Sequence, residues 1–156
     1  MLPGGDPTYL AYVEARSAFV CGNFLSVILL SQAMIENLLG AHLVIEELSR
    51  SIHARNPLRE SKIPKRPSLD WVLSKCREIG LLTAQDEINL KRLRSIRNPP
   101  THFRPIDDPA NVERRALDQH KHAFALFEED ARFSITTVIQ LLSKPEFALG
   151  RRSTQT

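Results

Sequence analysis

Residues 24–49 read FLSVILLSQAMIENLLGAHLVIEELS, and their apolar side chains recur at steps of three and four residues. This spacing places the side chains on one stripe of an α-helix. Two positions on the stripe are polar, Gln32 and Glu36, which a helix buried in a core would not carry freely. Because Asn37 and His42 also interrupt the apolar run, it predicts the buried helix of a folded core and not a membrane span.

Start and stop signals around this stretch predict four further helices. A side-chain acceptor marks the start of a helix, whereas a glycine or a proline marks its end. By these signals the helices cover about residues 6–21, 69–79, 84–98 and 110–142. The last is expected as one helix or with a break near Asp118, and the pair Pro99-Pro100 should end or kink the one before it near Arg97 or Asn98. Since no stretch alternates as a strand does, the sequence predicts an all-α bundle of four or five helices.

The composition is that of one globular domain covering residues 1–156. Hydrophobic residues make up 42% and charged residues 25% of the chain, which excludes a disordered or collagen-like protein. The net charge of +3 permits an anionic partner without requiring one. Positive charge gathers at about residues 50–67, where we expect a mobile basic loop that is either a solvated linker or a segment that attracts phosphate. A polar tail is expected at about residues 144–156.

The two cysteines bear on the cellular setting. Cys21 and Cys76 each stand among apolar neighbours, so both are expected to be small buried side chains and not part of a disulfide scaffold. The N-terminal residues lack the basic and apolar regions of a signal peptide. We therefore expect a reducing, cytoplasmic setting and no membrane partner.

The candidate catalytic residues lie in the segment LRSIRNPPTHFR, residues 93–104. This segment places Arg97 and His102 five residues apart at the expected end of a helix. Arginine stays charged and can bind a phosphate through two N–H groups, whereas histidine is suited to move a proton at neutral pH. Together they could cleave RNA without a metal. The imidazole would take the proton of the 2′-hydroxyl, and the guanidinium would hold the charge developing on the phosphate. Spacing alone does not single out this chemistry, since the two residue types fall five apart in many proteins.

The segment resembles the Arg-Asn-x-x-x-His signature of the HEPN superfamily, the small helical domains of many prokaryotic toxins and defence ribonucleases. Residues 33–39 resemble the second helix of such domains, which carries a glutamate among leucines. Residues 69–102 are similar to their short helix, Gly-Leu-Leu turn and helix ending in Leu-Arg-x-Ile-Arg-Asn. Asp130-Ala131 and the aliphatic stripe after it resemble their last helix. The resemblance covers roughly residues 22–142, and its specific residues are Arg97, Asn98 and His102.

The resemblance implies a role for each motif residue. Arg97 would bind the scissile phosphate, His102 would be the acid or base, and Asn98 would orient the histidine or contact RNA. Glu36 would support Arg97 as a buried counter-ion, which would account for a charge on the apolar stripe of its helix.

Two features depart from the family pattern. Arg104 stands where the subgroup paired with minimal nucleotidyltransferases usually has a tyrosine, two residues after the histidine, which argues against membership of that toxin–antitoxin subgroup. The Pro99-Pro100 pair also stiffens the motif. As basic neighbours of the motif, Arg94 and Arg104 are expected to contact RNA.

The function implied by the resemblance is a metal-independent endoribonuclease of toxin or phage-defence type, with no cofactor. Two other classes stay open: a non-catalytic HEPN module for protein–protein assembly or sensing, and a helical RNA-binding protein that does not cleave. The expected partners are RNA, a second copy of the chain, and an antitoxin or other partner protein. A homodimer is expected because one chain supplies one motif histidine, whereas the reaction benefits from a base and an acid.

Other candidate residues have simpler interpretations. His120 and His122 do not predict a metal site, because side chains two residues apart on a helix point away from each other. Residues 128–130, Glu-Glu-Asp, are expected to form an exposed acidic turn. Trp71 and the phenylalanines are expected in the core and not as base-stacking platforms.

Overall fold

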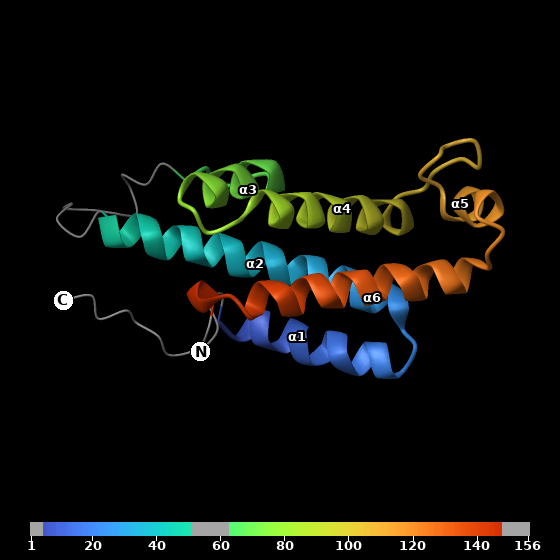
Figure 1. Cartoon of the computed structure of the whole chain (residues 1–156), viewed down its shortest axis with the longest axis horizontal. Coiled ribbons are helices and arrows are strands. Elements are labelled where there is room, and N and C mark those ends of the chain that lie inside the picture. The colour runs from blue at the N-terminus through green and yellow to red at the C-terminus, as the bar shows by residue number, and fades with distance from the viewer. Residues whose placement is uncertain (1–4, 51–62, 148–156) are drawn as a thin grey trace.

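The computed structural model describes residues 5–50 and 63–147, and these form helices without a strand (Figure 1). In chain order the helices are α1 (Gly5–Val20), α2 (Phe24–Arg50), α3 (Leu69–Glu78), α4 (Ala84–Thr101), α5 (Val112–Asp118), α6 (Ala123–Leu142) and the short 3₁₀ helix η1 (Pro145–Phe147). The predicted all-α class is confirmed. The described part has six α-helices and not four or five, because residues 110–142 form two helices with the break after Asp118. Residues 51–62 of the expected basic loop and 148–156 of the polar tail lie outside the described residues.

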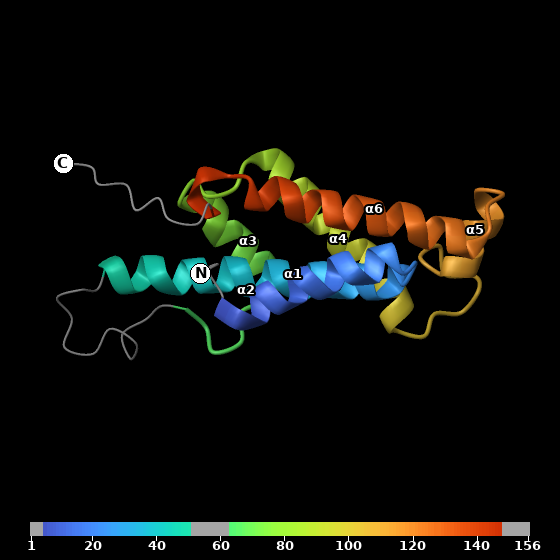
Figure 2. The ribbon, with the colours of Figure 1, turned by 90° about the horizontal axis from the view of Figure 1, so that it is seen from below.

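Helix α2 is the centre of the bundle and packs against α1, α3, α4 and α6. Its inward stripe supplies core residues that are at most 1% exposed: Met34, Ile35, Leu38 and Leu39. Helix α1 runs antiparallel to α2, and the turn between them contains Gly22 at a φ of 74°, which glycine adopts readily. Helix α4 also runs antiparallel to α2, so the end of α4 lies at the same end of the bundle as the start of α2 (Figures 1 and 2).

Side-chain caps fix the starts of α3 and α4, as predicted. The hydroxyl of Ser68 accepts a hydrogen bond from the amide of Trp71 at 3.2 Å. Thr83 and Asp86 make the two reciprocal hydrogen bonds of a capping box. These hydrogen bonds satisfy amides of the first helical turn that have no partner within the helix.

The end of α4 differs from the prediction. The helix includes Pro99 and Pro100 and continues to Thr101. A proline lacks its own amide hydrogen bond, but its fixed φ is compatible with helical backbone. Pro99 is buried, and Ile96 packs in a small core cluster that includes Ile28 of α2. We infer that packing of these last turns outweighs the local preference of the proline pair.

The Phe24–Ser49 part of α2 is long and apolar enough to cross a membrane, judged by length and composition alone. Core helices of soluble proteins meet the same measure. In this structure α2 packs against four other helices.

Candidate functional site

The motif lies in the last turns of α4, at the end of the bundle where the chain leads into α5 (Figure 1). Ile96 is 6% exposed and packs in a cluster with residues of α2 and α6. Because successive residues turn by about 100° around a helix axis, Arg97 faces a different direction from Ile96, and it is half-buried. Nη1 of Arg97 donates to Oδ1 of Asn98 at 3.4 Å. The observed contact of Asn98 is therefore with the arginine and not with His102.

His102 is the capping residue directly after α4. Its backbone leaves the helical conformation, with φ of −133° and ψ of 136°, and its side chain is exposed. Among the described residues the imidazole has no hydrogen-bond or ion-pair partner, so both ring nitrogens are accessible to a ligand. The structure thus places Arg97, Asn98 and His102 together at the end of one helix.

The prediction that Glu36 is buried is wrong. The residue is exposed, and its Oε1 accepts a hydrogen bond from Nε2 of Gln32 at 2.7 Å. Among the ion pairs of the described residues, none joins Glu36 to Arg97. The reason is the register of the two antiparallel helices: Ile28 packs in one cluster with Ile96, and Glu36 lies eight residues further along α2. Eight residues span about 12 Å along a helix, which carries Glu36 away from the level of Arg97.

The two arginines expected to contact RNA both have carboxylate partners. Nη1 of Arg94 lies 2.8 Å from Asp70 of α3. Nη1 of Arg104 donates to Asp108 at 2.6 Å. A hydrogen bond from the amide of Ala110, together with that from Arg104, holds the pKa of Asp108 below its ordinary value. Both arginines can still reach an anion, but each would share its charge with a carboxylate.

The loop between α4 and α5 is held by its own side chains. The amide nitrogen Nδ2 of Asn111 donates to the carbonyl of Arg104 at 2.8 Å, and Oδ1 of Asn111 caps α5 by accepting from the amide of Arg114 at 3.0 Å. Phe103 precedes this held segment and is 96% exposed. The expectation that the phenylalanines belong to the core is therefore wrong for Phe103, and also for Phe124, which is 55% exposed.

An ion pair between α5 and α6 was missed by sequence reasoning. Asp130 is 7% exposed and does not lie in an exposed acidic turn as expected. Its two carboxylate oxygens accept from Nη1 and Nη2 of Arg115 at 3.1 and 3.3 Å. The helical periodicity of α6 could have predicted that Asp130 is buried. Asp130 lies on the same buried stripe of α6 as Ser134, Val138 and Leu141.

His120 and His122 lie between α5 and α6. The prediction placed both of them on one helix, and this placement is wrong. His120 has a φ of 51°, and Nδ1 of His122 caps α6 by accepting from the amide of Phe124 at 3.2 Å. Within residues 5–50 and 63–147, no group of three or more His, Cys, Asp or Glu side chains is arranged to hold a metal.

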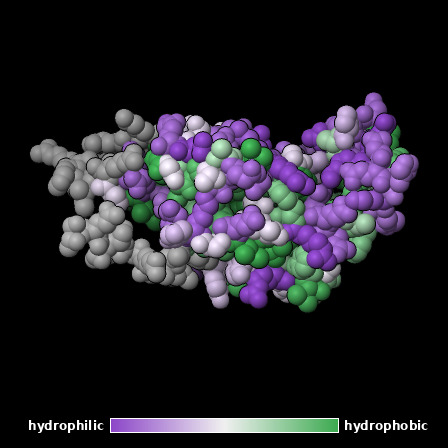
Figure 3. All heavy atoms as spheres, in the orientation of Figure 1, coloured by the Kyte–Doolittle hydropathy of each residue, from purple (hydrophilic) through white to green (hydrophobic). Residues whose placement is uncertain are grey.

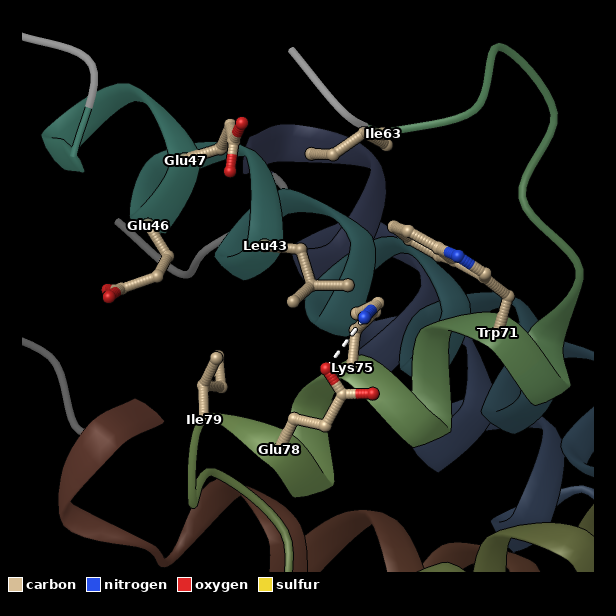
Figure 4. A pocket seen from close by; sticks show the side chains of 8 residues that line it. All are labelled: Leu43, Glu46, Glu47, Ile63, Trp71, Lys75, Glu78 and Ile79. Carbon is tan, nitrogen blue, oxygen red and sulfur yellow. Dashed lines mark hydrogen bonds and ion pairs between the residues drawn. The ribbon is translucent and has the colours of Figure 1, made fainter.

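A hollow of about 240 Å³ lies near the opposite end of the bundle, between α2 and α3 (Figure 4). Leu43 and Trp71 give it apolar walls, and the carboxylates of Glu46, Glu47 and Glu78 line it as well. Figure 4 shows Glu78 turned toward Lys75 of the same helix, with which it forms an ion pair at 2.6 Å. Carboxylates repel phosphate, so this hollow does not suit the backbone of RNA.

The chain was compared with models of protein families, with curated proteins and with solved structures, and none of them matches it.

Proposed function

We propose that the chain is a HEPN-type endoribonuclease that cleaves RNA without a metal, as a toxin or phage-defence effector acting in the cytoplasm. The observation that supports this most directly is the position of His102. Its imidazole is exposed and has no partner among the described residues, and it follows the half-buried Arg97 by five residues. An exposed imidazole without a partner can exchange a proton with a bound ligand at neutral pH.

The proposed reaction is an attack of the ribose 2′-oxygen on the adjacent phosphorus. His102 takes the proton of the 2′-hydroxyl as the P–O2′ bond forms. The P–O5′ bond then breaks, the leaving 5′-oxygen takes up a proton from an acid, and the products carry a 2′,3′-cyclic phosphate and a 5′-hydroxyl. Arg97 binds the non-bridging oxygens and stabilises the charge that develops on them. Asn98 holds the guanidinium through the contact at 3.4 Å.

The acid for the 5′-oxygen is proposed to come from a second copy of the chain. A two-fold dimer repeats every residue across its axis, so it could bring two copies of Arg97 and His102 to one cleft. The side chain of His102 is exposed at the end of α4, which suits such an arrangement.

A second candidate function is a non-catalytic HEPN module that binds a partner protein, such as an antitoxin or a sensor. The observation that favours it is an apolar groove of about 500 Å³ between α1 and α6. Val13, Val20 and Ile139 line the groove and are 43%, 86% and 51% exposed. Exposed apolar surface of this kind is typical of sites that bind proteins.

Cleavage in the presence of excess EDTA tests the enzymatic proposal. Single-stranded RNA should be cut to 2′,3′-cyclic phosphate or 3′-phosphate and 5′-hydroxyl ends, and DNA should stay intact because it lacks the 2′-hydroxyl. We expect His102→Ala to lower the rate by about 100-fold or more. Arg97→Ala should lose a similar factor, since it removes the charge that stabilises the transition state.

Matched controls separate this loss from damage to the fold. His120→Asn replaces another exposed histidine, and asparagine tolerates the positive φ at that position. Arg114→Ala breaks only an exposed ion pair with Asp118 within α5. Both controls should keep wild-type activity. Intact RNA after incubation with wild-type protein would favour the partner-binding module, and cleavage that needs magnesium or survives both substitutions would show that other residues are responsible.

A further inference from the structure

We propose that Phe103 stacks on an unpaired nucleobase next to the phosphate at which Arg97 and His102 act. This inference rests on the function proposed above and names its substrate class, RNA with single-stranded nucleotides at the cleavage site. Phe103 is 96% exposed, the largest exposed fraction of any large hydrophobic side chain in the described residues. It directly follows His102 in the chain, so its ring is attached one residue from the proposed acid–base group.

Neighbouring structure fixes the backbone on both sides of Phe103. Before it, α4 continues to Thr101. After it, the carbonyl of Arg104 accepts from Asn111 at 2.8 Å, and the guanidinium of Arg104 is bound by Asp108. These contacts fix the backbone beside Phe103, from which the exposed ring projects.

Exposure alone does not indicate a ligand, because single apolar residues are common on protein surfaces. The surroundings of Phe103 give the stronger argument. Its chain neighbours are a histidine and an arginine, and Figure 3 shows mainly hydrophilic residues over the end of the molecule that carries α5. Basic residues beside an exposed aromatic ring are the combination by which proteins bind single-stranded nucleic acid, with phosphates on the charges and bases on the ring.

Stacking requires a base that is not paired within a helix, because the faces of paired bases are covered by their neighbours. The proposal thus predicts a preference for loops, bulges and unstructured RNA over duplexes. It also predicts that any of the four bases can be held, since each has a face on which an aromatic ring can stack.

Binding of a short single-stranded RNA with 2′-O-methyl groups tests the proposal apart from cleavage, because this RNA lacks the attacking hydroxyl. By fluorescence anisotropy, Phe103→Ala should weaken binding about 10-fold or more, and Phe103→Leu should not restore it. Phe103→Trp should bind as wild type does. In a Trp71→Phe background, the fluorescence of the Phe103→Trp variant should be quenched by this RNA and not by one with an abasic nucleotide at the stacked position. Tyr9→Ala, which removes a 56% exposed aromatic ring near the start of α1, is the matched control and should bind unchanged.

The outcomes separate this inference from the proposed function. If the wild type cleaves RNA while Phe103→Ala binds the 2′-O-methyl RNA as tightly as wild type, stacking is rejected and the ribonuclease stands. If the wild type binds but does not cleave, and Phe103→Ala weakens binding, the ribonuclease is rejected and stacking stands. If the wild type neither binds this RNA nor cleaves unmodified RNA, both proposals are rejected. If Phe103→Ala instead dissociates a dimer without affecting the RNA affinity of the remaining protein, Phe103 is a contact between copies and the inference is overturned.

Discussion

Asp130 is the one buried Asp or Glu side chain among the described residues, and Arg115 donates to both of its carboxylate oxygens. Removing one partner of a buried ion pair leaves the other without compensation. The side chain of Arg115 is 25% exposed, so water can recover part of this loss. We expect Asp130→Ala to lower the free energy of unfolding by about 2 kcal/mol, measured by urea denaturation.

Glu36→Ala is the matched control for this variant. Glu36 is exposed and accepts one hydrogen bond within its own helix, from Gln32. The substitution should change the free energy of unfolding by no more than about 0.5 kcal/mol. A loss as large as that of Asp130→Ala would contradict the structure and would return Glu36 to the role of a buried counter-ion.

The two cysteines should differ in reactivity. Burial raises the pKa of the Cys76 thiol to about 12, so this thiol is both covered and protonated at neutral pH. Cys21 is exposed just after the end of α1, contrary to the expectation from its apolar neighbours, because those neighbours do not tell which way a residue in a turn points. We expect one thiol to react with a maleimide in the native protein at about pH 7 and both to react in urea. Equal reaction rates of two thiols in the native protein would contradict this assignment.

At the scale of the helix, start signals predict the structure better than stop signals do. The caps at Ser68 and Thr83 are hydrogen bonds between residues three apart, so the local sequence contains everything they need. The end of α4 depends on packing against α2, which the local sequence does not contain, and the helix passes through Pro99-Pro100. Helix α5 begins at Val112 and not at about residue 110, because the side chain of Asn111 caps it. The carboxylate of Asp108 accepts from Ala110 and Arg104 in the turn before the helix.

A contact between elements should give the stability a pH dependence. Lys144, after α6, donates to Asp86 in the first turn of α4. Burial acts to raise the pKa of Asp86, but hydrogen bonds from Lys144 and Thr83 outweigh burial and hold the pKa below its ordinary value of 3.8. A carboxyl group with a lowered pKa stabilises the folded state above the unfolded pKa, and this contribution is lost as the pH falls through the folded pKa.

We therefore expect Asp86→Asn to be less stable than the wild type at about pH 7, with a difference that shrinks as the pH falls below about 4. Urea denaturation of both proteins from about pH 7 to about pH 2.5 measures the difference directly. A difference that is constant over this range, or that grows toward low pH, would show that Lys144 and Thr83 do not stabilise the charged form of Asp86 in the folded state.

At the scale of the whole molecule, the sequence predicts the local part of the candidate site and not its surroundings. Arg97, Asn98 and His102 are close in the chain, so the sequence alone predicts that they lie near the same end of the helix. Which carboxylate pairs with a site residue depends on how a neighbouring helix or loop packs against that residue. The axial register of α2 and α4 keeps Glu36 from contacting Arg97. The packing of α3 places Asp70 beside Arg94. Neither register nor helix position can be read from periodicity, which fixes only the face that a helix buries.

The assembly of the molecule follows from the chemistry proposed for this site. One His102 can accept the proton of the 2′-hydroxyl, but the leaving 5′-oxygen needs a proton from a second group, which a two-fold related chain would supply. We expect light scattering to show a homodimer at micromolar concentration. The shared cleft needs one His102 as the base and the other as the acid, so a mixed dimer of wild-type and His102→Ala chains should be as impaired as His102→Ala alone. Co-expression of these two chains in equal amounts should therefore leave about a quarter of the wild-type activity, the share of dimers with two intact histidines. A monomer at this concentration would contradict the prediction. A mixture that keeps about half of the wild-type activity would show that each chain acts alone and would place the axis elsewhere, with the apolar groove between α1 and α6 as the next surface to test.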